Sequence, residues 1–236
     1  MIHHAAYLRA GKVLLAMRAL RSAGVPLDGR RIFDVGFGAG GFLRRCPVGA
    51  SLFGVEQDPA TVAEVATMLR SRGHTKVDLR SVDLEFEASP ALYEHGLDLV
   101  HASHLLEHLD DPARFLATAR EAIIPGGRFI GLVPVNERAR DPHHVHRPDR
   151  AMVEAWARAS DWELTLYEEN DPYLYWAQPL FTSETGARHK LAQALSLTLG
   201  IPATLLGDRR WFEAATTFER WTRSLPTQAV FVLRAA

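Results

Sequence analysis

The sequence lacks several features that would place it in a specialised class of protein. It has a single cysteine, Cys46, among 236 residues, which excludes an internal disulfide and a zinc site built from several cysteines. It has no excess of either charge, because 27 basic residues are balanced by 28 acidic residues, whereas nucleic-acid-binding domains usually carry a basic surplus. It has no apolar run of the roughly 20 residues that a membrane span needs. We therefore expect a cytoplasmic protein without a membrane span and without a nucleic-acid partner.

The chain does contain helix and strand patterns that alternate along much of its length. Hydrophobic residues make up 47% of it, which is enough for a packed core. Short apolar runs predict strands at residues 31–35, 51–55, 77–82, 97–102, 127–133, 163–167 and 229–234. Helical periodicity and capping residues predict helices at 5–22, 42–45, 59–72, 113–123 and 151–160. This alternation favours an α/β fold, in which helices cover both faces of a parallel sheet.

A glycine-rich stretch, "FDVGFGAGG", spans the end of the first predicted strand and the loop after it. Glycines at such spacing let the backbone approach a ligand closely and place that ligand at a helix N-terminus. Gly36, Gly38 and Gly41 satisfy the dinucleotide-binding pattern G-x-G-x-x-G. Gly36, Gly38 and Gly40 also satisfy a second pattern, D-x-G-x-G-x-G, which begins at Asp34. The loop alone therefore leaves open a nicotinamide dinucleotide and a nucleoside cofactor with an amino-acid end.

A carboxylate stands about 20 residues beyond this loop, at the end of the second predicted strand. This residue is Glu56. A carboxylate at that position would accept hydrogen bonds from ribose hydroxyls in either kind of cofactor. Glu56 thus supports a nucleoside ligand without choosing between the two.

Further stretches along the chain carry a resemblance to a known family. They are "FDVGFGAGG", "FGVEQDP", "RSVDLEF", "LDLVHASHLLEHLDDP" and "PGGRFIGLVP". Over about residues 30–170 the sequence resembles the class I S-adenosylmethionine-dependent methyltransferases, which carry such blocks in this order. The resemblance implies a three-layer αβα Rossmann-like fold with a seven-stranded, mostly parallel sheet. It also implies that the antiparallel last strand inserts beside the fifth.

The resemblance also implies a cofactor, S-adenosylmethionine, with S-adenosylhomocysteine as its product. Its cofactor-binding positions lie on the first four predicted strands or just after them. They are Asp34, Gly36, Gly38 and Gly40 for the methionine part, Glu56 for the ribose diol, Gln57 and Asp83 with the Leu84 backbone for the adenine, and Ser103 with His104 for the sulfonium and the acceptor.

Histidines in two segments, "HASHLLEHLDDP" and "DPHHVHRPDR", are candidate general bases. A hydroxyl or amine acceptor benefits from a base, and histidine suits this role because its pKa lies near neutral pH. We expect the base to be His104, His143 or His144. A structural interpretation also stays open, in which Glu107 and His108 only tie the two segments together.

A third interpretation of the same segments is a metal site. Its ligands would be His104, Glu107, His108 and His146, a set of imidazoles and a carboxylate that suits zinc or another first-row metal. It resembles the Glu-x-x-Glu-His helix and later histidine of metal-dependent enzymes that methylate RNA 2′-hydroxyls. His104 stands where those enzymes carry the first glutamate, so our prediction is a site without a metal.

The chain is expected to form one methyltransferase domain over residues 1–236, with its core at about 25–169 and 226–236. In the family it resembles, an N-terminal helix, here 1–24, and an insertion, here 170–225, often form a cap over the substrate. Within this insertion, Tyr173, Tyr175 and Trp176 are candidate walls of the site.

The function predicted from the sequence is methyl transfer to a small-molecule acceptor, most simply at oxygen. Three alternatives stay open: a metal-dependent RNA 2′-O-methyltransferase, an NAD(P)-dependent oxidoreductase, and a cofactor-binding partner protein without catalysis. The exposed face of the cap leaves both a homodimer and a monomer open.

Overall fold

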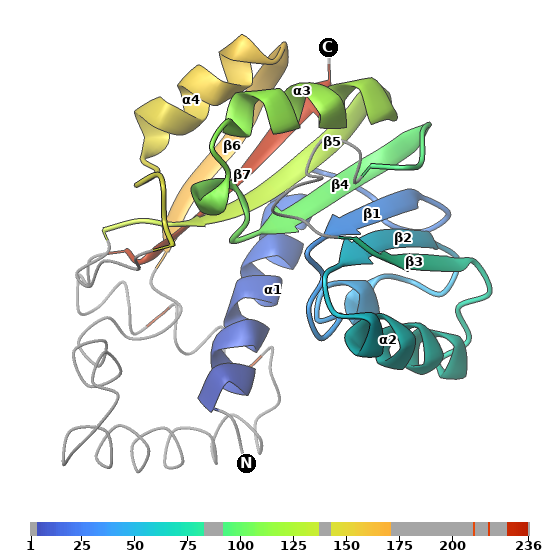
Figure 1. Cartoon of the computed structure of the whole chain (residues 1–236). Coiled ribbons are helices and arrows are strands. Elements are labelled where there is room, and N and C mark those ends of the chain that lie inside the picture. Colours follow the sequence, from blue (N-terminus) through green and yellow to red (C-terminus); the bar gives the residue numbers. More distant parts are fainter. Residues whose placement is uncertain are drawn as a thin grey trace, which may run out of the picture.

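A seven-stranded sheet with strand order β3-β2-β1-β4-β5-β7-β6 forms the centre of the molecule (Figure 1). The computed structural model describes residues 4–82, 92–136, 143–170, 210, 217 and 226–235. The strands are β1 (Arg31–Val35), β2 (Ser51–Glu56), β3 (Val77–Ser81), β4 (Leu97–Ser103), β5 (Ile123–Pro134), β6 (Trp162–Asn170) and β7 (Gln228–Ala235). The neighbouring strands β3, β2, β1, β4 and β5 pair in parallel, and β7 lies between β5 and β6 and runs antiparallel to both. The predicted sheet, including the place of its last strand, is confirmed.

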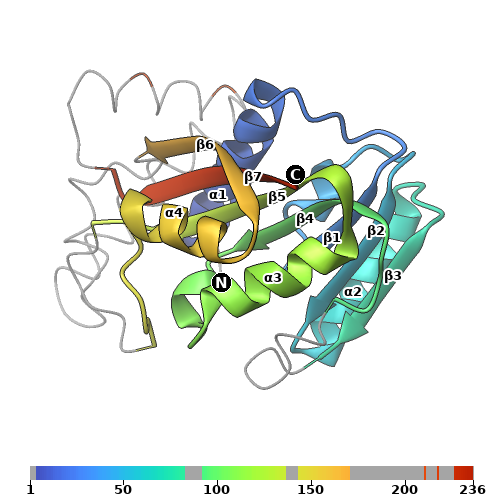
Figure 2. The same ribbon diagram turned by 90° about the horizontal axis from the view of Figure 1, so that it is seen from above.

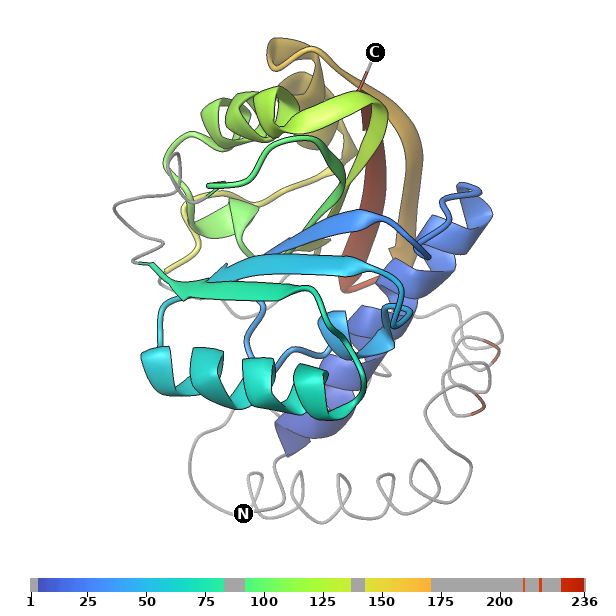
Figure 3. The same cartoon turned by 90° about the vertical axis from the view of Figure 1, so that its right-hand side faces the viewer.

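Helices cover both faces of this sheet, as Figures 1 and 2 show. On one face lie α1 (His4–Ser22) and α2 (Pro59–Ser71), and Figure 3 shows α2 running below β1, β2 and β3. On the other face lie α3 (Pro112–Ala122) and α4 (Arg150–Ala159). Asp58, Asp111 and Asp149 accept hydrogen bonds from first-turn N–H groups and so fix the starts of α2, α3 and α4.

The two-residue period of the strands separates the core into two apolar layers. In β1, Phe33 and Val35 pack in the layer that includes α3 and α4, and Ile32 packs in the layer that includes α1 and α2. Asp34 lies on the same face as Ile32, because alternate residues of a strand share a face. The carboxylate of Asp34, near the end of β1, therefore points into the apolar layer that lies between the sheet and the helices α1 and α2.

Two local differences from the predicted elements have clear causes. The helix expected after the glycine loop is only the 3-10 turn η1 (Leu43–Arg45), because the residue before Pro47 is extended. Strand β5 begins earlier than expected, since Ile123 already pairs with Leu97 before a shift of register near Leu99. Among the described residues, none of the helices combines the length and apolar character needed to cross a membrane.

Candidate functional site

A cavity of about 890 Å³ opens at the carboxyl ends of β1, β2 and β4. The chain order of the sheet reverses between β1 and β4, which is where ligands bind in open α/β sheets. The walls come from α1, the glycine loop, η1, α2 and three strand ends. They are Lys12, Val13, Asp34, Gly36, Phe37, Gly38, Ala39, Gly41, Phe42, Arg44, Arg45, Glu56, Thr61, Glu64, Val65, Met68, Arg72, His101 and Ser103.

Two glycines of the loop serve different purposes. Gly38 has a φ of +49°, and a Cβ added there would meet no atom within 4 Å. Gly40 has a φ of +68°, but a Cβ there would lie 2.6 Å from Val65 Cγ1. Gly38 therefore keeps open a space beside the backbone that no atom of the described residues fills, whereas Gly40 allows the loop to pack on α2. An open cradle at Gly38 is what a ligand would need for close approach.

The carboxylate of Glu56 lies against this loop. Its Oε2 accepts a hydrogen bond from the Gly38 N–H at 2.6 Å, and its Oε1 accepts one from the Gln57 N–H at 2.9 Å. A pyrophosphate bound at the Gly38 amide would therefore face a negative charge. The second lone pair on each carboxylate oxygen is still able to accept from a hydroxyl. This geometry disfavours the dinucleotide interpretation and fits a ribose diol.

A buried polar pair, Asp34 and His101, forms the inner wall of the cavity. The two residues are register partners on β1 and β4, and His101 Nδ1 lies 2.6 Å from Asp34 Oδ1. The His101 ring stacks on Phe42 with 4.0 Å between ring centroids. Burial raises the pKa of Asp34, and the contact with His101 opposes that rise. His101 belongs to the histidine-rich segment that the sequence offers for candidate bases, and its place two residues before Ser103 puts both side chains on one face of the strand.

His104 follows β4 with a left-handed backbone, at a φ of +55°. Its N–H donates to the Leu132 carbonyl at 2.9 Å, which holds this strained conformation in place. Its Nδ1 lies 3.0 Å from Glu107 Oε1, and its Nε2 lies against the side-chain oxygen, Oε1, of Gln228 on β7. Gln228 is separated from His104 by most of the chain, and no local sequence pattern indicates this contact.

His104 is adjacent to the cavity without being one of its lining residues. Ser103, the preceding residue, lines the cavity, and so does Lys12 of α1. Burial lowers the pKa of His104, and the positive charge of Lys12 lowers it further, while Glu107 and Gln228 oppose both effects. The net direction keeps the imidazole neutral near neutral pH, which is the form that can accept a proton.

Glu107 is fully buried in the turn η2 (Leu106–His108). Its backbone carbonyl accepts from the N–H groups of Val145 and His146, which joins this turn to the loop after β5. Burial alone would raise the pKa of the Glu107 carboxyl, but the contact with His104 and further favourable interactions lower it overall. Neither carboxylate oxygen accepts a well-aligned hydrogen bond from the described residues. An ionised carboxylate so placed needs a cation or a better-aligned donor.

Side chains around Glu107 form a cluster that differs from the predicted metal set. One ligand atom each from Glu107, His108 and His144 lies within 4.8 Å of the others. His108 Nδ1 contacts the His143 carbonyl at 3.1 Å, so its Nε2 is directed elsewhere. His146 packs on Trp156 and reaches toward the Asp110 carbonyl. The structure therefore groups His144, rather than His146, with Glu107.

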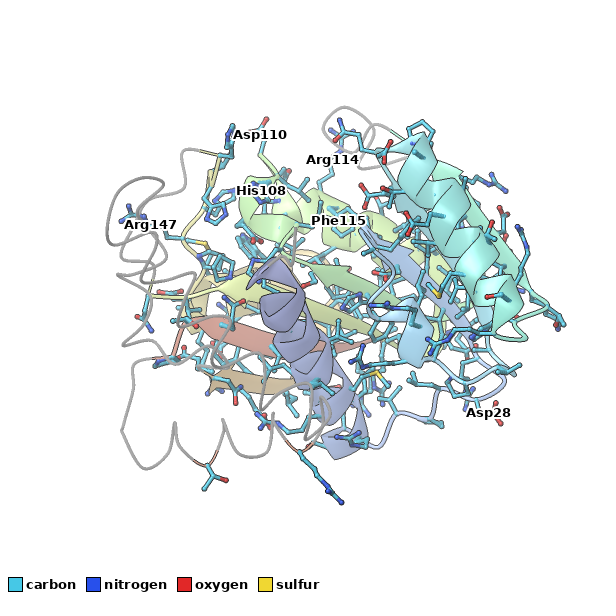
Figure 4. All side chains as sticks on the ribbon, turned by 90° about the horizontal axis from the view of Figure 1, so that it is seen from below. Asp28, His108, Asp110, Arg114, Phe115 and Arg147 are labelled. Atoms are coloured by element: carbon cyan, nitrogen blue, oxygen red, sulfur yellow. The ribbon has the colours of Figure 1, made fainter. Side chains whose placement is uncertain are left out.

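The surroundings of this cluster are visible from below the molecule. Figure 4 labels His108 and Asp110 in the turn after β4, with Arg147 of the returning loop on the same side. The His108 and His144 rings meet edge to face at 4.7 Å. His143, in the same loop, is exposed.

The residues predicted to bind the cofactor or to form walls of the substrate site fall into three groups. Asp83, Leu84, Tyr173, Tyr175 and Trp176 lie outside the described residues. Gln57 is exposed and Gly40 packs on Val65, so neither is a lining residue. The predicted residues that line the cavity are Asp34, Gly36, Gly38, Glu56 and Ser103.

Comparison with known proteins agrees with this architecture. The family described as "Methyltransferase domain" matches residues 33–131. A ubiquinone biosynthesis O-methyltransferase of Cereibacter sphaeroides is 31% identical over 111 residues, covering 46% of this chain and 43% of that protein. Another, from Paracidovorax citrulli, is 30% identical over 119 residues, covering 49% and 48%. The matches span slightly less than half the length of these relatives.

Solved structures share the fold at lower identity. The geranyl diphosphate C-methyltransferase of Streptomyces coelicolor A3(2) superposes with a TM-score of 0.62 at 13% identity, covering 94% of this chain and 80% of that one. The [4+2]-cyclase SpnF superposes with a TM-score of 0.61 at 20% identity, with the same coverage of 94% and 80%. The predicted Rossmann-like methyltransferase fold is confirmed. Because one of these neighbours is a cyclase, the fold alone does not determine the reaction.

Proposed function

We propose that this chain is a class I S-adenosylmethionine-dependent methyltransferase and that it transfers the methyl group of S-adenosylmethionine to an oxygen of a small-molecule acceptor. The observation that carries the proposal is the cavity wall. It combines an open glycine cradle at Gly38, a carboxylate at the end of β2 and a buried carboxylate at the end of β1. Relatives that match nearly half of the chain are named O-methyltransferases, which supports oxygen as the acceptor atom.

The cavity residues fit the proposed cofactor in chemistry. Glu56 would accept from the ribose hydroxyls, and the open space at Gly38 would admit the chain that links ribose to the amino-acid end. Asp34 would face the cationic amino-acid end. Lys12 and Val13 of α1 would close the site from the side, so this helix would form part of a cap. The rest of the cap of this single domain would be the insertion 170–225, as the family resemblance implies.

The bound cofactor would supply an electrophilic methyl group on a sulfonium, which leaves as a neutral thioether. The protein would place the acceptor oxygen in line with that methyl, and positioning alone can provide much of the rate. The acceptor hydroxyl would take the place of Gln228 Oε1 at His104 Nε2. Glu107 would then hold the Nδ1–H of a neutral His104, and Nε2 would accept the proton of the hydroxyl. His143 and His144 are the other candidate bases.

The first test is calorimetric titration of the purified chain with S-adenosylmethionine, S-adenosylhomocysteine and NAD(H). We expect saturable binding of both sulfur compounds and none of NAD(H), because the Glu56 carboxylate occupies the Gly38 amide that a pyrophosphate would use. Saturable NAD(H) binding without S-adenosylmethionine binding would overturn the proposal. A panel of phenols and catechols then tests turnover, and tight cofactor binding with no turnover on any acceptor would favour a non-catalytic partner protein.

A second candidate function, metal-dependent O-methylation, has one observation in its favour. Glu107 is buried with both carboxylate oxygens lacking a well-aligned donor, and His108 and His144 each bring a ligand atom to the same place. Imidazole nitrogen and carboxylate oxygen are ligands that suit zinc and its first-row neighbours. In this version a cation would bind the acceptor oxygen, and the ligand set would be Glu107, His108 and His144.

Removal of metal tests this second candidate. On the base mechanism, prolonged dialysis against EDTA is expected to leave the turnover rate within twofold, because His104 already contacts Glu107. Elemental analysis of the same samples is the matched measurement. Loss of one equivalent of metal together with loss of turnover, restored by zinc or another first-row ion, would replace the base mechanism with the metal-dependent one.

A further inference from the structure

The pair of Asp34 and His101 is unusual in its position. Asp34 is 1% exposed and His101 is 4% exposed, and the residues that precede them on this face, Ile32 in β1 and Leu99 in β4, are apolar and buried. A carboxyl this deeply buried tends to lose its charge, since burial favours the neutral form. A hydrogen-bond donor to the carboxylate works in the opposite direction.

The contacts of His101 determine which form of its ring suits this place. An ionised carboxylate only accepts hydrogen bonds, so a neutral His101 donates its Nδ1–H to Asp34 Oδ1 across 2.6 Å. Its Nε2 is buried and has no hydrogen-bond partner among the described residues. A second proton on Nε2 would leave an unpaired donor there, which is costly in a buried position. Stacking on Phe42, with 12° between the rings, fixes the direction of the Nδ1–H.

From these contacts we infer that His101 is a positioning residue, which keeps the Asp34 carboxylate charged and aimed into the cavity to bind the ammonium of the cofactor's amino-acid end. The inference rests on the proposed function. Burial and the nearby Glu56 raise the Asp34 pKa, whereas His101 lowers it, so the charge of the Asp34 carboxylate depends on the contact with His101. Lys12 lines the same cavity and suits the carboxylate of the amino-acid end.

The test uses two ligands that differ at the amino-acid end. S-adenosylhomocysteine carries the ammonium and carboxylate, whereas 5′-methylthioadenosine shares the adenosine and thioether but lacks both. The variants His101→Asn and His101→Leu are nearly equal in size and both remove the ring stack. Only the asparagine retains an N–H where Nδ1 stands, so the pair isolates the donor.

We expect His101→Leu to weaken S-adenosylhomocysteine binding at least tenfold by calorimetry and to leave 5′-methylthioadenosine within twofold. His101→Asn should stay within about threefold of the wild-type chain for both ligands. Asp34→Asn should likewise weaken the binding of S-adenosylhomocysteine but not of 5′-methylthioadenosine. The double variant with His101→Leu should bind S-adenosylhomocysteine no more weakly than Asp34→Asn alone, because His101 acts through Asp34. Asp34→Asn also serves as the test if neither His101 variant folds, as judged by thermal melting.

Equal weakening of both ligands in His101→Leu would mean general damage to the cavity and would overturn the inference. So would unchanged S-adenosylhomocysteine affinity in His101→Leu, or in Asp34→Asn. If the wild-type chain binds neither ligand, the proposed function itself fails. The two failures are therefore distinguishable.

Discussion

Replacement of Gly38 by alanine is expected to weaken S-adenosylmethionine binding at least 30-fold while leaving the chain folded. The added Cβ meets no atom of the described part of the chain within 4 Å, so it projects into the space that the cofactor would use. The positive φ of +49° adds a backbone strain of about 1–2 kcal/mol, which a urea unfolding curve would measure. Calorimetric titration of the folded variant gives the change in affinity.

Gly96 provides a matched control for this substitution. Its φ is +69°, a Cβ there also meets nothing within 4 Å, and it lies before β4, among the residues that do not line the cavity. Gly96→Ala should therefore lose a similar amount of stability and bind S-adenosylmethionine like the wild-type chain. Gly40→Ala should lose more stability, because its Cβ would stand 2.6 Å from Val65 Cγ1. If Gly38→Ala binds within threefold of Gly96→Ala, the loop is not the cradle of the cofactor.

The fold was accessible from the sequence because its signals are local and repeat along the chain. Apolar runs bounded by Asp-Pro caps, such as Asp58-Pro59 and Asp111-Pro112, fix where helices begin. The antiparallel last strand came from the family resemblance. The early start of β5 was missed, because the pairing of Ile123 with Leu97 is a tertiary contact that overrides the turn signal of the glycines after Pro125.

The candidate site was less accessible, because its important contacts join residues far apart in the sequence. Gly36, Gly38 and Glu56 follow a recognised spacing, and the structure places all three on one cavity. The partners that decide their chemistry carry no local motif. Gln228 reaches His104 from β7, and His101 meets Asp34 only because β1 and β4 are neighbours in the sheet.

Sequence also could not distinguish which histidine accompanies Glu107. His144 and His146 are two residues apart, so any motif that fits one nearly fits the other. The structure separates them through the backbone N–H groups of Val145 and His146, which both bind the Glu107 carbonyl. This anchoring places the His146 ring on Trp156 and leaves His144 beside His108.

Replacement of His104 by glutamine is expected to lower kcat by about 10²–10⁴-fold, the range typical of a general base, with cofactor affinity within threefold. The ring contacts the Glu107 carboxylate, and glutamine cannot accept the proton. In the wild-type chain, kcat should fall as pH decreases through the pKa of His104. Burial and the positive charge of Lys12 lower that pKa. The midpoint of the decrease in kcat should therefore lie at a pH below the ordinary histidine pKa of about 6.5.

Two further variants decide whether His104 or a cation activates the acceptor. Lys12→Met removes one of the causes that lower the His104 pKa, so the acidic fall in kcat should move to higher pH at saturating cofactor. His108→Ala should reduce kcat less than fivefold on the base mechanism, since His108 is exposed and its Nδ1 contacts only a backbone carbonyl among its described partners. If kcat falls as much in His108→Ala as in His104→Gln, and bound metal is lost in parallel, the acceptor is activated by a cation bound at Glu107. An unmoved pH profile in Lys12→Met would separately remove His104 as the titrating group, because the charge of Lys12 acts on that ring.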